Sequence, residues 1–268
     1  MKVLVIGATG FTGSVVAAAF ARAGHDVGAL QRPGGRPVPA AYRAVPGDLA
    51  DPASLLAAAA GFDLVLHVGA ILSEEIDVPA VDALLASGVP LVYTSSVDTL
   101  GPGFVTEDSL PDPHPVVGWR DVVERRVLAA GGRMIRPGLI YGEGGGVVDD
   151  MLKPLAARVG AGVYIGEPGV RWAAVHVEDL AELFLLVAEL APPASVWHAV
   201  TETVTVDAIA TAVGDGTAVS WPEDDEPPSE IAVIAGLFRY DQDVSSEKTR
   251  QKLGWRPVHT SLIEFLAR

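Results

Sequence analysis

Cysteine is absent from this chain of 268 residues, and lysine is scarce. Without thiols the chain forms no disulfide, uses no thiolate nucleophile and holds no cysteine-ligated zinc or iron–sulfur centre. Lysine stands only at Lys2, Lys153, Lys248 and Lys252, so no lysine can serve in catalysis between the first two of these positions. The absence of cysteine fits a reducing compartment, and we expect a cytoplasmic protein.

Basic runs and long apolar runs are missing as well. The net charge is −15, whereas a nucleic-acid binder needs a basic surface that releases counterions. The most apolar stretch, "LAELFLLVAELA", carries Glu182 and Glu189 and is too short for a membrane span, and the first apolar run is too short for a signal peptide. We therefore expect no nucleic-acid or membrane partner, and a soluble monomer or homodimer that binds a small molecule.

What the sequence does contain is a regular alternation of short apolar strands with helical stretches. Hydrophobic residues make up 49% and charged residues 20% of the chain, which is enough for a sizeable core. This alternation predicts a Rossmann-type α/β fold, a doubly wound parallel sheet with helices on both faces. The predicted strands span residues 2–7, 26–30, 42–48, 63–69, 90–96 and 133–142.

The first strand runs into "GATGFTG", where Gly7, Gly10 and Gly13 follow one another at intervals of three residues. The first glycine permits a tight turn, the second lets the backbone approach a pyrophosphate, and the third lets the helix pack closely on the strand. The loop therefore predicts a dinucleotide site. We assign its residues to cofactor binding: Gly7, Thr9, Gly10, Phe11, Thr12 and Gly13.

The end of the second strand reads "ALQRPGGR" and lacks the carboxylate that would bind the ribose 2′-hydroxyl of NAD. Gln31, Arg32 and Arg36 stand there instead, and an arginine can pair with a 2′-phosphate, so NADP(H) is favoured over NAD(H). Solvated surface arginines are the alternative. Further on, Asp48 and Leu49 can hold the adenine, although Asp48 can equally be a turn aspartate that caps the next helix.

Six segments together resemble the extended short-chain dehydrogenase/reductase superfamily, in its NAD(P)-dependent epimerase/dehydratase branch: "GATGFTG", "GDLADP", "LVYTSSVDTLG", "RPGLIYGEGGG", "VHVEDLA" and "SSEKTRQKLGWRP". The resemblance implies a Rossmann domain over residues 1–142 plus about 171–202. It also implies a small substrate lobe over about 143–170 and 203–268. In that family the residues corresponding to Val68, Gly69 and Ala70 line the ribose, and those corresponding to Pro137 and Gly138 meet the nicotinamide carboxamide.

The family's catalytic set is a Ser or Thr after the fifth strand and a Tyr-x-x-x-Lys on the next helix. The first element matches Ser96, with Ser95 beside it. The second is missing, because none of the five tyrosines has a lysine four residues later. Family members commonly carry a glutamate four residues after the lysine, and aligning Glu124 with it puts Arg120 at the lysine position and Val116 at the tyrosine position. The chain thus resembles an atypical member.

Arg120 in this alignment can bind the cofactor ribose and stabilise an oxyanion, but a guanidinium does not donate a proton in proteins. Its alternative is a pair with Glu124 on an exposed helix face. Ser96 can polarise a carbonyl or simply cap local backbone. Tyr141, Asp121 and His114 are further groups that can reach the pocket.

A metal is not expected. His176 and Asp179 have a spacing that allows ligation, but the sequence offers no apparent third ligand.

Three functions are compatible with these residues. The first is an NADP(H)-dependent oxidoreductase that acts on a small organic carbonyl, imine or activated alkene, with the proton supplied by Ser96, by water or by the substrate. The second is a redox-neutral epimerase, isomerase or lyase that retains its cofactor. The third is an NADP-binding sensor without catalysis. The sequence does not name the substrate.

Overall fold

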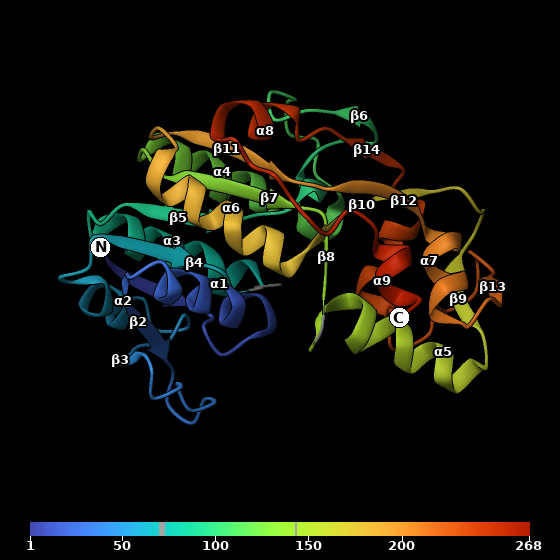
Figure 1. Ribbon diagram of the computed structural model, residues 1–268, viewed down its shortest axis with the longest axis horizontal. Helices are drawn as coiled ribbons and strands as arrows, with labels where there is room; N and C mark the ends of the chain where they lie inside the picture. The colour runs from blue at the N-terminus through green and yellow to red at the C-terminus, as the bar shows by residue number, and fades with distance from the viewer. Residues whose placement is uncertain (70–72, 143) are drawn as a thin grey trace.

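A parallel sheet of seven strands forms the centre of the computed structural model, which describes residues 1–69, 73–142 and 144–268 (Figure 1). The strand order is β11-β7-β5-β4-β1-β2-β3. The chain order reverses between β1 and β4, and the carboxyl ends of the strands open a crevice there. The strands are Lys2–Ile6 (β1), Asp26–Gln31 (β2), Arg43–Pro46 (β3), Leu64–His67 (β4), Leu91–Thr94 (β5), Arg133–Pro137 (β7) and Ser195–Ala199 (β11).

Helices cover both faces of this sheet, which confirms the predicted Rossmann-type fold. One face packs against α1 and α6, whose Phe20 and Phe184 are fully buried. The other packs against α2, α3 and α4 through Leu55, Leu84 and Val123. The helices are Phe11–Arg22 (α1), Pro52–Ala59 (α2), Glu74–Ala86 (α3), Arg120–Ala129 (α4) and Val177–Leu190 (α6).

A smaller lobe with its own apolar core lies at one end of the sheet, on the right in Figure 1, and the chain ends in it. Its helical segments are Val148–Leu152 (η3), Lys153–Val159 (α5), Val206–Val213 (α7), Ala232–Arg239 (η4) and Leu262–Leu266 (α9), and its strands Gly162–Ile165 (β9) and Ala218–Trp221 (β13). A three-stranded sheet of Leu139–Tyr141 (β8), Arg171–His176 (β10) and Glu202–Thr205 (β12) joins the two units.

The structure differs from the predicted boundaries in two places. The strand predicted over 133–142 is divided at Gly138, because β7 stays in the main sheet while β8 pairs with β10. A Cβ at Gly138 would lie 2.4 Å from the carbonyl oxygen of Ala173, so the crossing requires glycine. The second concerns the segment of about 171–202 that the resemblance implies for the Rossmann domain, because its first strand, β10, lies in the connecting sheet and β11 in the main sheet.

Part of the segment predicted for the lobe also returns to the Rossmann unit, outside the main sheet. Gln242–Val244 (β14) pairs with Gly103–Val105 (β6), and Glu247–Leu253 (α8) follows it. Leu253 and Trp255 then pack into the core beneath α6. Within the described ranges, no helix has the length and apolar character needed to cross a bilayer.

Candidate active site

The loop after β1 forms one wall of a cavity of about 680 Å³. Gly7 has a φ of +91°, and its carbonyl oxygen accepts a hydrogen bond from the amide of Gly10 at 2.9 Å. A Cβ at Gly13 would lie 2.0 Å from that oxygen, so only glycine allows the turn to close. Bare backbone at the start of α1 fits a pyrophosphate. All the predicted loop residues line the cavity: Gly7, Thr9, Gly10, Phe11, Thr12 and Gly13.

Two neighbouring loops meet this wall. Val68 and Gly69 follow β4, Pro137 and Gly138 lie where β7 passes into β8, and all four line the same cavity. A Cβ at Gly7 would lie 2.9 Å from the amide nitrogen of Gly69, so the loops after β1 and β4 touch. Ala70, the third residue that the resemblance implies for the ribose, lies outside the described residues.

The residues predicted for the adenosine end lie along the same edge of the sheet. Gln31 ends β2, and Arg32 is exposed just beyond it. The guanidinium of Arg36 folds back and donates to the carbonyl oxygen of Thr9 at 3.3 Å, which brings a cation to the glycine loop.

At the end of β3, the Asp48 carboxylate accepts a hydrogen bond from the amide of Ala50 at 3.0 Å, so a turn role is present. A Cβ at Gly69 would lie 3.9 Å from the side chain of Leu49. Leu49 therefore stands close to the loop after β4. The roles of Gln31, Arg32, Asp48 and Leu49 in cofactor binding stay predictions.

Arg120 lies inside the protein rather than on an exposed helix face. Its side chain lines the cavity, and the residue is only 7% exposed. Nη1 lies 3.2 Å from the hydroxyl of Tyr93 and 3.4 Å from the carbonyl oxygen of Thr94. The Tyr93 hydroxyl in turn donates to the buried carboxylate of Asp77 on α3. Burial raises the pKa of Tyr93, so its hydroxyl stays protonated and serves to hold Arg120.

Glu124 is 2% exposed, so the alternative of an exposed pair between Arg120 and Glu124 is wrong. Glu124 instead binds the buried Arg136 of β7 through both carboxylate oxygens. It also accepts hydrogen bonds from Ser95 at 2.5 Å and from Thr99 at 3.1 Å. This network fixes α4 against the sheet. The hydroxyl of Ser95 is committed to it, although Ser95 also borders the cavity.

Ser96 has a partner that the sequence did not single out. Its hydroxyl donates to the carboxylate of Asp98 at 2.7 Å, and it accepts from the amide of Asp98 at 3.2 Å. Both residues line the cavity beside Arg120. Burial raises the pKa of Asp98, against the opposing effects of the Ser96 hydrogen bond and of the charges on His114 and Arg120. The "SSVD" spacing was the available signal, since a Ser that caps a helical turn brings the residue two positions on close to its hydroxyl.

Among the described residues that line the cavity, none is a tyrosine, and Val116, which the resemblance aligns with the family's tyrosine, is one of the lining residues. Tyr141 is buried in the lobe against Phe265. Asp121 pairs with Arg125 on α4, and the ring of His114 packs edge-on against Tyr240. These three further candidates therefore point into other contacts.

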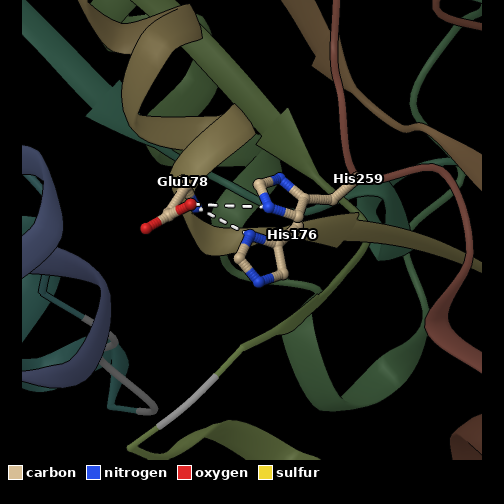
Figure 2. Close-up of side chains that lie close together, drawn as sticks. All are labelled: His176, Glu178 and His259. Carbon is tan, nitrogen blue, oxygen red and sulfur yellow. Dashed lines mark hydrogen bonds and ion pairs between the residues drawn. The ribbon is translucent and has the colours of Figure 1, made fainter. Parts of the chain in front are cut away.

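His176 lies close to Glu178 and to His259, a residue far along the chain (Figure 2). Asp179 accepts from the amides of Val258 and His259, both at 2.9 Å, so it fixes the C-terminal segment. The possible ligand set is instead His176, Glu178 and His259. The two imidazole rings are stacked, with centroids 3.8 Å apart and 20° between their planes. The nitrogen lone pairs lie in the ring planes, so the lone pairs of two stacked rings run side by side and do not converge on one ion. The absence of a metal stays a prediction.

The fold and the glycine loop together define a Rossmann protein of the dinucleotide-binding class. The chain matches the NAD dependent epimerase/dehydratase family over residues 3–117. An uncharacterized protein of Saccharomyces cerevisiae is 30% identical, and the match covers 98% of this chain and 97% of that protein. The chain therefore belongs to the NAD dependent epimerase/dehydratase family.

Two further relatives show the range of this similarity. A 3-diazoavenalumate denitrifying reductase from a Streptomyces species is 29% identical, with 100% of both chains covered. Among solved structures, the Thermus thermophilus UDP-glucose 4-epimerase complex with NAD has a TM-score of 0.78 at 21% identity, covering 100% of this chain and 97% of that chain. That structural likeness concerns the fold alone.

Proposed function

We propose that the protein is an NADP(H)-dependent oxidoreductase that reduces a small organic carbonyl, imine or activated alkene. The observation that carries this proposal is a single cavity that runs from the glycine loop to Ser96, Asp98 and Arg120. A bound nicotinamide cofactor would supply the hydride. The protein would contribute orientation, a cation and a proton route.

The residues that would hold the cofactor are the glycine loop at the pyrophosphate and Arg120 at the nicotinamide ribose. Arg36 supports the preference for NADP(H), because its guanidinium lies on the glycine loop at Thr9, close to the end of β2. A 2′-phosphate in this position would meet a cation in place of the carboxylate that NAD requires.

The proton would pass through Ser96. As a hydride was delivered to the carbonyl carbon, the carbonyl oxygen would take the hydroxyl proton of Ser96. A protonated Asp98 would return a proton to Ser96 across their 2.7 Å contact, in the direction opposite to the hydrogen bond that Ser96 donates in the structure. Asp98 then regains a proton from solvent. This route assigns to a carboxyl and a hydroxyl the task of the missing phenol, and it needs Asp98 in its protonated form.

Calorimetric titration with NADPH and NADH, followed by NADPH absorbance in the presence of small carbonyl compounds, imines and activated alkenes, tests the proposal. We expect NADPH to bind about tenfold more tightly than NADH or better, and to be consumed with at least one substrate class. Binding without consumption would favour a redox-neutral enzyme or a sensor. Failure of both dinucleotides to bind at millimolar concentration would overturn the proposal.

A further inference from the structure

The lobe side of the cavity differs in chemistry from the cofactor side. Apolar side chains come from the segment before α4, from η3, from β10 and from η4, and they include Val116, Met151, Trp172, Val233, Ile234 and Leu237. The Trp172 indole is held in place, since its Nε1 donates to the carbonyl oxygen of Leu237 at 2.9 Å and its ring packs on Phe238.

Two of these apolar side chains stand open to solvent at the cavity. Val233 is 43% exposed and Val116 is 38% exposed, and the segments that carry them contact each other. Apolar surface left in water costs about 25 cal/mol per Å². An apolar ligand that covered these side chains would recover that free energy, so the wall is suited to such a ligand.

Charge on the lining argues in the same direction. Among the described residues that line the cavity, Arg120 is the sole basic side chain, and it lies beside the residues assigned to the nicotinamide ribose. The described acidic lining residues are Asp150 and Asp98, of which Asp98 is neutral in the proposed route. A diphosphate in the substrate would need its own cations, because phosphate recognition relies on charge-assisted hydrogen bonds from arginine or lysine.

We infer that the substrate is a neutral, largely apolar molecule and not a nucleotide sugar or a carboxylate. This inference rests on the proposed function and specifies its substrate class. The reacting group would lie at Ser96, and the apolar body would pack between Trp172 and the side chains of η4. The cavity volume, shared with the nicotinamide end, suits one small ligand of this kind.

The test uses the protein saturated with oxidised NADP+, so that the carbonyl compounds bind without being reduced. Calorimetry compares acetophenone and benzylideneacetone with their para-carboxylated versions, and with UDP-glucose and dTDP-glucose. We expect the neutral compounds to bind about tenfold more tightly than their carboxylates or better, and the nucleotide sugars to give no binding at millimolar concentration. Tighter binding of either nucleotide sugar, or equal binding of neutral and carboxylated members, would overturn the inference, as would no binding by any neutral compound.

A pair of matched variants locates the binding. Val233→Asn should weaken the neutral compounds about tenfold and leave the Kd of NADPH unchanged. Val219→Asn on β13 alters a valine of similar exposure, 40%, that is not among the cavity residues, and should change neither. Equal effects of the two variants would also count against the inference. The proposed function fails at an earlier step, when NADPH alone does not bind, so the two failures are distinguishable.

Discussion

The two sides of the cavity are built in opposite ways. The cofactor side consists of backbone, with glycines at Gly7, Gly10 and Gly13 where side chains would collide. The substrate side consists of side chains drawn from four separate segments of the chain. The backbone of the glycine loop can recognise only the part of a ligand that is common to the whole family. The side chains of the opposite wall can be substituted without disturbing the sheet. The cofactor side therefore reveals the class of chemistry, and the substrate side sets the specificity.

Asp98 lies where the two sides meet, and its removal should have the largest effect. We expect Asp98→Asn to lower kcat about 100-fold, within the usual range for loss of a general acid. In the native enzyme the rate should fall as pH rises through the pKa of Asp98, because the route needs the protonated form. Since burial raises this pKa above the usual range, the falling limb should lie at a higher pH than for an exposed aspartate.

The pH profile of kcat separates this role from a structural one. His114, Arg120 and Tyr240 are the other titratable or charged groups near Asp98, and Asp98→Asn leaves all three in place. The limb should vanish in Asp98→Asn and persist in Asp108→Asn, which alters an exposed carboxylate paired with Lys248. A limb that persists in Asp98→Asn would assign the pH dependence to another group.

A smaller effect is expected on the cofactor side from Arg36→Ala. Loss of its guanidinium should weaken NADPH binding about tenfold and leave NADH binding unchanged, because only NADPH carries the 2′-phosphate. Calorimetry with both dinucleotides measures this, with Arg22→Ala at the exposed end of α1 as the control. Equal losses for NADPH and NADH would show that Arg36 acts only on the shape of the loop.

The smallest effect on the site should come from Tyr93→Phe. The variant keeps the buried ring but removes the hydroxyl that accepts from Arg120 and donates to Asp77. We expect a loss of about 1–3 kcal/mol in the free energy of unfolding and a few-fold weaker binding of NADPH. Denaturant unfolding and calorimetry check both, with Tyr164→Phe in β9 as the control. Unchanged NADPH binding would mean that Tyr93 does not position Arg120.

The sequence predicted the cofactor side because its signals are local. Glycine spacing after a strand depends on sterics within seven residues, so Gly7, Gly10 and Gly13 could be assigned directly. The alternation of strands and helices is also a local pattern, and it predicted the sheet. The split at Gly138 was not predicted, because its cause is the approach of Ala173, which is distant in sequence.

The partners of the catalytic candidates were harder to predict because they depend on contacts across the fold. Spacing on a helix paired Glu124 with Arg120, whereas packing against β7 pairs it with Arg136. The side chains of η4 that line the cavity likewise lie more than 100 residues after Ser96, Asp98 and Arg120 in the chain. Such juxtapositions have no signature in a single sequence.

The crossing at Gly138 joins the sheet to the lobe by one uninterrupted stretch of backbone. The residues that the resemblance assigns to the nicotinamide, Pro137 and Gly138, and the first strand of the connecting sheet are thus consecutive parts of one segment, β7 to β8. A tilt of the lobe about Gly138 would change the distance between a bound hydride donor and its acceptor. The glycine loop proposed to bind the diphosphate would not move.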